Sequence, residues 1–189
     1  MKQLLFIRHG ATAGNLERRY IGCTDEPLCE EGVTQIKALR CQQWKPVKLF
    51  VSPMLRTKQT AELLFPDVPQ TTVNDFREMD FGIFEGKPAD ELACVPEYQT
   101  WVDGRCLGPV PMGESTADFK ARCCKAFAEA ITTMPDDSTA AFVVHGGVIM
   151  AILEFYARSQ RSFYEYHIGN GSYLWCTYEK ESLYLQSSF

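Results

Sequence analysis

The sequence predicts an α/β protein, a three-layer α/β/α sandwich whose mostly parallel sheet carries an antiparallel edge strand. Short apolar runs alternate with longer segments of helical periodicity along the 189 residues, which is typical of strands joined through crossover helices. Two final strands, at 172–178 and 183–186, are joined by a short turn at 179–182, so we expect an antiparallel hairpin at one edge. The length favours a single domain over residues 1–189 with one sizeable core.

The first strand ends in residues that can do chemistry. Residues 4–7 form an apolar run that leads directly into Arg8, His9 and a glycine. A second apolar run, at 140–144, leads in the same way into His145 and two glycines. Ligands of α/β proteins bind just beyond the carboxyl ends of the strands. Two of the three histidines in the chain are therefore expected at one shared site.

The segments that follow the first strand indicate an anion site. A polar loop over 11–29 is long for a compact domain, which is typical of a functional loop. A helical pattern follows Gly32, and a strand at 49–51 precedes another helix, which we expect Ser52 to cap. Arg56 then falls in the first turn of that helix, where a cation opposes the helix dipole. A bound anion there would satisfy both the cation and the free N–H groups.

The second half of the chain supplies the remaining predicted elements. We expect a strand within 68–74, a loop over 76–86, and an irregular insertion or lid at about 87–113 with some helix around 90–101. Ser115 and Asp118 resemble a capping box that opens the next helix. The strand at 140–144 and a helix to about residue 157 follow. We expect the last helix to turn Val148, Ile152 and Phe155 inward. His167 is expected at a strand edge or on the surface.

Composition argues against several classes of partner. The net charge of −5, with no basic block, argues against nucleic-acid and anionic-membrane partners. Apolar runs stay well short of the ~20 residues of a membrane span, and the amino terminus lacks the apolar core of a signal peptide. The eight cysteines show neither disulfide nor zinc-site spacing. We therefore expect a cytoplasmic protein with reduced cysteines, no metal site and no cofactor.

The residue types at the predicted site fit a phosphoryl group. The guanidinium groups of Arg8 and Arg56 can bind its oxygens bidentately, and Asn15 and the N–H of Gly146 can add donors. A neutral histidine can act as the nucleophile and form phosphohistidine. A carboxyl group must also protonate the leaving oxygen. Three candidates for that carboxyl stay open: Glu78, Asp80 and Glu85.

Five stretches taken together resemble the histidine phosphatase (phosphoglycerate mutase-like) superfamily. They are residues 8–15, 22–32, 52–61, 78–82 and 144–147, which read RHGATAGN, GCTDEPLCEEG, SPMLRTKQTA, EMDFG and VHGG. They follow the order of the family and cover nearly the whole chain.

The resemblance implies a role for each site residue. The catalytic set would be His9 as the nucleophile, Glu78 as the proton donor, and Arg8, Arg56 and His145 as the phosphate pocket. The substrate-binding set would be Asn15, Gly146, Thr12 and Gly22. Two positions depart from the family pattern, because Ala11 stands where an acidic residue is common and Gly14 where an aromatic residue often stands. Both departures bear on substrate fit.

The activity implied is that of a metal-independent phosphomonoesterase, which acts on a small phosphorylated metabolite and releases inorganic phosphate. Chain length and the stretch 78–86 look most similar to α-ribazole phosphatases, which remove a 5′-phosphate in the nucleotide-loop branch of cobalamin synthesis. Residues 111–115, PMGES, resemble the PGGES run of such small phosphatases. Two alternatives stay open: a phosphoglycerate mutase, for which the chain is short, and a non-catalytic phospho-ligand binding module. The sequence leaves the oligomeric state open.

Overall fold

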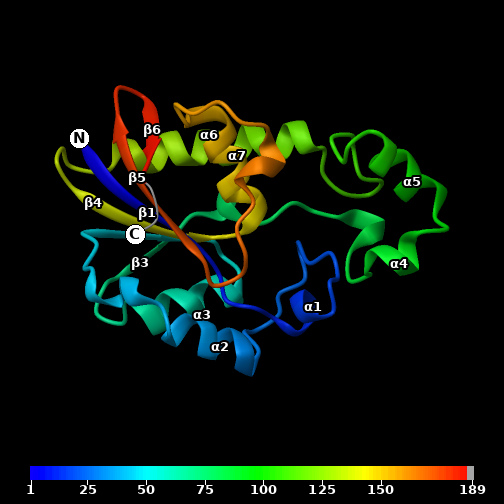
Figure 1. Cartoon of the computed structure of the whole chain (residues 1–189), viewed down its shortest axis with the longest axis horizontal. Coiled ribbons are helices and arrows are strands. Elements are labelled where there is room, and N and C mark those ends of the chain that lie inside the picture. The colour runs from blue at the N-terminus through cyan, green and yellow to red at the C-terminus, as the bar shows by residue number, and fades with distance from the viewer. Residues whose placement is uncertain (187–189) are drawn as a thin grey trace.

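One mixed sheet forms the centre of the molecule (Figure 1). The computed structural model describes residues 1–186, except for the side chains of residues 40 and 42. Within these residues the sheet has six strands in the order β3-β2-β4-β1-β5-β6. The strands are β1 Lys2–Arg8, β2 Lys48–Val51, β3 Gln70–Thr72, β4 Thr139–Val144, β5 Tyr173–Glu179 and β6 Ser182–Leu185. Strands β1 to β4 run parallel, and β5 and β6 pair antiparallel at one edge, which confirms the predicted fold class.

Helices cover both faces of this sheet. They are α1 Ala13–Leu16, α2 Glu30–Lys37, α3 Leu55–Leu64, α4 Ala89–Leu92, α5 Pro96–Asp103, α6 Thr116–Thr132 and α7 Gly146–Tyr156, with 3₁₀ turns η1 Arg40–Gln43, η2 Asn74–Phe76, η3 Gly82–Phe84 and η4 Phe163–Tyr166. Figure 1 shows α6 and α7 on one face and α2 and α3 on the other. No helix among the described residues is both long and apolar enough to cross a membrane.

Alternating side chains of β1 build two cores. Leu4 and Phe6 pack with the buried residues of α6 and α7, whereas Leu5 and Ile7 pack with those of α2 and α3. All four side chains are fully buried. This pattern follows from the two-residue period of a strand that is covered on both faces. The central strand is therefore rigidly held up to the point where Arg8 and His9 leave it.

Helix α3 begins differently from the prediction. Its first residue is Leu55 and its N-cap is Met54, which makes no side-chain cap. The hydroxyl of Ser52, expected to cap this helix, instead lies 2.7 Å from Nε2 of His145. The capping prediction for Ser52 was therefore wrong, because the helix begins only at Leu55, later than predicted; the Ser52 oxygen accepts from the N–H of Met54, at 3.4 Å, ahead of the helix. Arg56 does lie in the first turn of α3, as predicted.

The prediction that Phe155 faces inward was also wrong, since its side chain is 71% exposed. Every residue of α7 from Val148 to Leu153 is buried. A helix buried nearly all round has no amphipathic period, so spacing alone could not show where the covering ends. Phe155 lies in the last turn, with its ring 4.8 Å from that of Tyr156.

Residues 87–113 carry α4 and α5, which project beyond the end of the sheet (Figure 1). Two aromatic side chains of α5, Tyr98 and Trp101, are buried. Their rings pack against Phe84 and Tyr20, with centroids 5.3 to 6.0 Å apart. These contacts tie the segment to the polar loop that follows β1.

Candidate active site

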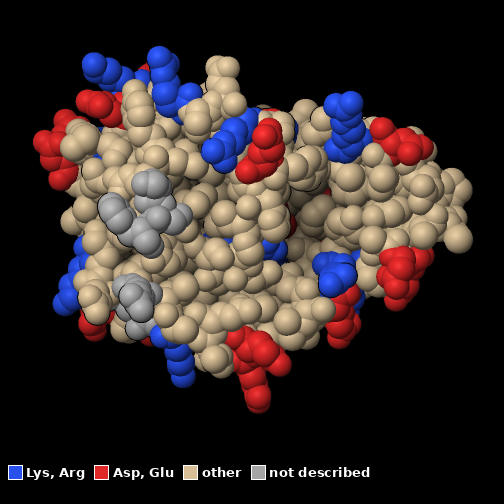
Figure 2. Space-filling view, in the orientation of Figure 1, with Lys and Arg blue, Asp and Glu red and all other residues tan. Residues whose placement is uncertain are grey.

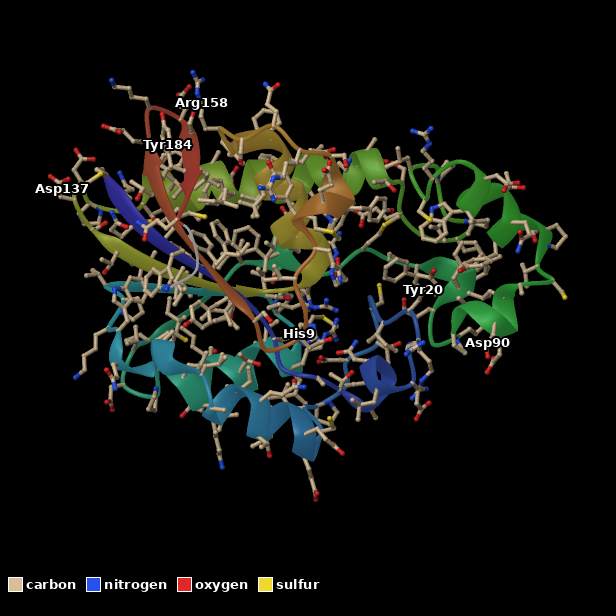
Figure 3. All side chains as sticks on the ribbon, in the orientation of Figure 1. His9, Tyr20, Asp90, Asp137, Arg158 and Tyr184 are labelled. Atoms are coloured by element: carbon tan, nitrogen blue, oxygen red, sulfur yellow. The ribbon has the colours of Figure 1, made fainter. Side chains whose placement is uncertain are left out.

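Three parallel strands deliver polar residues to one point. Arg8 is paired with Val144 across β1 and β4, and β2 and β4 pair Val51 with Val143. The residues that follow these strands directly are His9, Ser52 and His145. The two imidazole centroids lie 5.0 Å apart, and His9 lies at the carboxyl end of β1 (Figure 3). The structure thus brings together the two histidines that the sequence placed at strand ends.

The His9 side chain is held in one tautomer. Its Nδ1 lies 2.7 Å from the carbonyl oxygen of Gly10, and a carbonyl can only accept, so Nδ1 carries the hydrogen and Nε2 carries the lone pair. Burial, together with the nearby Arg56 and Arg8 cations, holds the pKa of His9 well below its ordinary value of 6.5. His9 is therefore neutral at pH 7, with Nε2 available as a nucleophile.

Two guanidinium groups flank this imidazole with unused donors. Arg56 is fully buried, and its Nη1 and Nη2 donate to the carbonyls of Thr24 at 2.7 Å and Gly22 at 3.0 Å. Nη1 of Arg8 donates to the carbonyl of Ile168 at 2.7 Å. Within the described part of the chain, neither Arg8 Nε nor Arg56 Nε has an acceptor. Buried donors are rarely left unpaired, so these two N–H groups point to an anionic ligand.

His145 adds a further donor. Its Nε2 lies 2.7 Å from Ser52 Oγ, while its Nδ1 has no partner among the described residues. Burial, then Arg56 and His9, keep the pKa of His145 well below its ordinary value. When the Ser52 hydroxyl donates to Nε2, the Nδ1–H of a neutral His145 remains free to bind an oxygen of a ligand.

Glu78 differs from the other two candidate carboxylates. Its Oε2 accepts from the N–H of Gly147 at 3.0 Å, at the start of α7. Asp80 accepts from Gly82 N–H at 2.9 Å, and Glu85 accepts from Gly22 N–H at 2.7 Å. Among the described residues, Glu78 alone of the three lines the cavity beside the histidines. A Cβ on Gly147 would lie 2.3 Å from Glu78 Oε1, so a larger residue there would displace the Glu78 carboxylate.

The amide of Asn15 is oriented by its neighbours. Its Oδ1 accepts from the backbone N–H of Thr12 at 3.2 Å and from Asn170 Nδ2 at 3.0 Å. The first of these partners can only donate, which assigns Oδ1 to that side. Asn15 lines the cavity together with Arg8 and Glu78, and its NH₂ group is left for a ligand.

The other predicted binding residues serve the site through their backbone or their small size. Thr12 is fully buried, and its hydroxyl caps α1. The N–H of Gly22 donates to Glu85, and its carbonyl accepts from Arg56. Gly146 lines the cavity, and a Cβ there would meet the Arg8 guanidinium carbon at 3.3 Å. Gly146 thus lets Arg8 lie against the start of α7.

A cavity of about 310 Å³ lies next to this point. Arg8, Asn15 and Glu78 line it, whereas the buried side chains of His9, Arg56 and His145 are not among its lining residues. Figure 2 shows the surface hollowed between the body that holds the sheet and the part formed by α4 and α5. At one end the cavity is polar, with Arg8, Asn15, Glu78 and Gly146. Its remaining wall is mostly apolar and aromatic, and includes Tyr20, Ile21, Met79, Phe81, Trp101, Phe119, Met150, Phe163 and Tyr164. Tyr20 faces this hollow from the loop after β1 (Figure 3).

Sequence reasoning missed the loop that precedes β5. His167 is exposed, as expected, but it also lines the cavity, and its Nε2 lies 3.2 Å from Arg8 Nη1. Asn170 donates to Asn15 and also, at 3.3 Å, to the carbonyl of His9. One signal could have found them. A strand antiparallel to β1 must start at the edge where β1 ends, so the residues just before 172 had to lie at the site.

The two buried histidines should make the protein less stable in acid. The unfolded chain protonates each near pH 6.5, whereas the folded-state pKa of both lies well below that value. Between the folded-state and unfolded-state pKa values, unfolding takes up protons. The free energy of unfolding therefore decreases as the pH is lowered, by up to about 1.4 kcal/mol per pH unit for each histidine. Urea unfolding in phosphate-free buffer at pH 7.5 and 5.0 measures the loss. His9→Gln should show a weaker dependence, and an unchanged dependence would contradict neutral burial of His9.

Both the sequence and the fold of this chain are similar to those of known proteins. The family model described as histidine phosphatase superfamily (branch 1) matches residues 4–188. The probable phosphoglycerate mutase GpmB of Yersinia pestis is 32% identical over 161 residues, which cover 81% of this chain and 74% of that protein.

Two solved structures share the fold. The α-ribazole phosphatase of Shigella flexneri superposes with a TM-score of 0.86 at 21% identity, over 97% of this chain and 94% of the other. YhfR of Bacillus stearothermophilus gives a TM-score of 0.86 at 22% identity, over 98% and 95%. At these identities the likeness concerns the fold.

Proposed function

Because the chain belongs to the histidine phosphatase superfamily, we propose that it is a metal-independent phosphomonoesterase that works through a phosphohistidine at His9. One observation carries the proposal: the imidazole of His9, with Nδ1 bound to a carbonyl, lies near two arginines whose buried Nε–H groups lack acceptors among the described residues. Such donors stabilise the negative charge that spreads over the phosphoryl oxygens in the transition state of phosphoryl transfer.

The reaction has two steps. In the first, Nε2 of His9 attacks phosphorus, the bond from phosphorus to the ester oxygen breaks, and a protonated Glu78 gives its proton to the leaving alcohol. In the second, Glu78 takes a proton from water, the resulting hydroxide attacks phosphorus, and the bond to Nε2 breaks. Inorganic phosphate leaves, and both His9 and Glu78 return to their starting states. Arg8, Arg56, His145 Nδ1 and the Asn15 amide hold the phosphoryl oxygens throughout.

The wall of the cavity favours a monoester of a large, uncharged alcohol. Aromatic and methionine side chains dominate the wall beyond the polar end. Arg19 also lines the cavity, and its guanidinium lies 3.0 Å from Glu17 and 3.8 Å from Glu26, so its charge is already balanced by carboxylates. A carboxylate on the substrate would have to compete with Glu17 and Glu26 for the Arg19 guanidinium. A phosphorylated nucleoside with a flat base, of which α-ribazole 5′-phosphate is one, fits this wall better than phosphoglycerate.

The Yersinia pestis relative, named a probable phosphoglycerate mutase, makes mutase activity the second candidate. A screen over phosphomonoesters that includes p-nitrophenyl phosphate, α-ribazole 5′-phosphate and 3-phosphoglycerate separates the two. We expect phosphate release from p-nitrophenyl phosphate and from α-ribazole 5′-phosphate, unaffected by EDTA. We expect no formation of 2-phosphoglycerate in the presence of a bisphosphate primer. Efficient mutase turnover would overturn the phosphatase proposal, and phosphate binding without turnover would indicate a non-catalytic binding module.

A further inference from the structure

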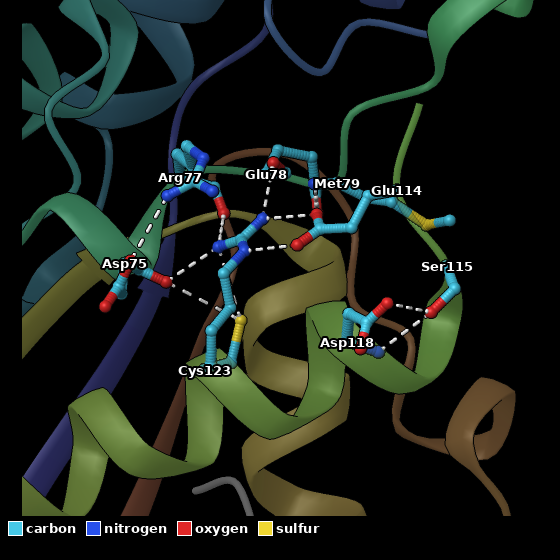
Figure 4. A network of polar contacts seen from close by, with 9 residues as sticks. Asp75, Arg77, Glu78, Met79, Glu114, Ser115, Asp118 and Cys123 are labelled. Carbon is cyan, nitrogen blue, oxygen red and sulfur yellow. Dashed lines mark hydrogen bonds and ion pairs between the residues drawn. The ribbon is translucent and has the colours of Figure 1, made fainter. Parts of the chain in front are cut away.

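One partly buried arginine of α6, Arg122, contacts the segment that carries Glu78 (Figure 4). Arg122 Nε and Nη2 donate to the two oxygens of Glu114 at 2.6 and 2.7 Å. Its Nη1 donates to the carbonyls of Asp75 at 2.7 Å and Arg77 at 2.8 Å, and Nη2 donates to the carbonyl of Glu78 at 3.0 Å. A guanidinium has five N–H groups, so every one of them is used.

The segment 75–78 is anchored in the core through Phe76, which is fully buried, but the carbonyls around Glu78 need donors of their own. Apart from the single turn η2 it lies outside helices and strands, so its carbonyls have no ladder partners. The carbonyls of Arg77 and Glu78 are partly buried, and Arg122 supplies both of them, as well as the carbonyl of Asp75, with donors. The side chains of Arg122 and Glu114 are only 11% and 14% exposed, so the carboxylate is needed to balance the cation.

Glu114 also binds the chain just beyond this segment. Its backbone N–H donates to the carbonyl of Asp80 at 3.0 Å. The peptides on either side of Glu78 are thus held by the guanidinium of one ion pair. Within the described residues, neither Arg122 nor Glu114 lines the cavity beside the histidines, so neither touches a substrate.

We infer that Arg122 and Glu114 form a positioning pair, which sets the Glu78 carboxylate against the Gly147 N–H and toward the leaving oxygen. The inference rests on the proposed role of Glu78 as proton donor. The inference assigns a role to Glu114, the glutamate of the PMGES stretch, which is not part of the proposed phosphate pocket. A positioning pair of this kind acts on the step that needs the Glu78 proton and leaves the binding of the phosphoryl group intact.

Leaving-group dependence tests this inference. We compare kcat/KM for an alkyl phosphate, whose alcohol must be protonated to leave, with kcat/KM for p-nitrophenyl phosphate, whose phenolate leaves without help. Arg122→Lys keeps the positive charge but cannot serve five acceptors. We expect it to lower kcat/KM about tenfold or more for the alkyl ester and less than about threefold for the aryl ester. In the Glu78→Gln background, Arg122→Lys should cause less than about a twofold further loss, because the group it positions is gone.

Controls separate positioning from folding. Phe127→Leu, buried in the core on the same helix, loses stability without touching the segment and should leave the alkyl-to-aryl ratio unchanged. If Arg122→Lys does not fold in urea-unfolding tests, Glu114→Gln replaces it, since it retains shape and removes one of the two acceptors. An equal loss on both esters, or a further loss in the Glu78→Gln background, would overturn the inference and leave the proposed function standing. If Glu78→Gln itself leaves the ratio unchanged, the proton-donor role fails and the inference fails with it.

Discussion

Replacing His9 with alanine is expected to lower the turnover of p-nitrophenyl phosphate by roughly 10⁴-fold or more, as the loss of a nucleophile does in other enzymes with covalent intermediates. The expected loss of turnover comes from the loss of one atom, the nucleophilic Nε2. Nε2 of His9 carries the lone pair because Nδ1 is bound to the Gly10 carbonyl, and alanine has no group that can accept the phosphoryl. Steady-state kinetics and rapid-quench trapping of ³²P-labelled enzyme measure the rate and the intermediate.

His145→Gln is the matched comparison for His9→Ala. It alters the other buried imidazole of the pair, 5.0 Å away, and removes the Nδ1 donor while the nucleophile stays. We expect slower turnover with labelled phosphoenzyme still formed at His9. Label that persists in His9→Ala, or a label found on residue 145, would contradict the assignment. Urea unfolding of both variants shows that the lost activity does not come from unfolding.

The strands and the two strand-end histidines could be predicted because local pattern determines them. An apolar run such as residues 4–7 reads as a buried strand wherever it lies, and parallel strands end at one edge of a sheet. His9 and His145 therefore had to be near one another once both runs belonged to the same sheet. The antiparallel hairpin followed in the same way from the short connection between β5 and β6.

Other features could not be predicted because they depend on contacts between distant segments. Ser52 has the sequence of a helix cap, yet α3 begins only at Leu55, and the Ser52 hydroxyl contacts His145, 93 residues away. Three carboxylates occupy one loop, and only the position of Gly147 at the start of α7 distinguishes Glu78 from its neighbours. Arg122 lies on a helix where an arginine reads as a surface residue, and its five acceptors come from outside that helix.

The second large effect is expected from Arg56→Met, which replaces a fully buried cation with an apolar side chain of similar length. Loss of the charge and of the Nε donor should lower kcat/KM by roughly 10³-fold. The carbonyls of Gly22 and Thr24 lose their donors, so the free energy of unfolding should fall by about 2 kcal/mol or more. Steady-state kinetics and urea unfolding measure these two effects separately.

The pH profile of Arg56→Met distinguishes a catalytic cation from a structural one. In the native protein the Arg56 charge helps to keep the pKa of His9 low, because a neighbouring cation disfavours the imidazolium. Removing that charge raises the pKa of His9, so the acid limb of kcat/KM should move to higher pH. Leu64→Ala, buried on the same helix away from the site, should lose about 2–5 kcal/mol of stability with no such movement. An unmoved acid limb in Arg56→Met would mean that Arg56 braces the 22–24 loop without acting on His9.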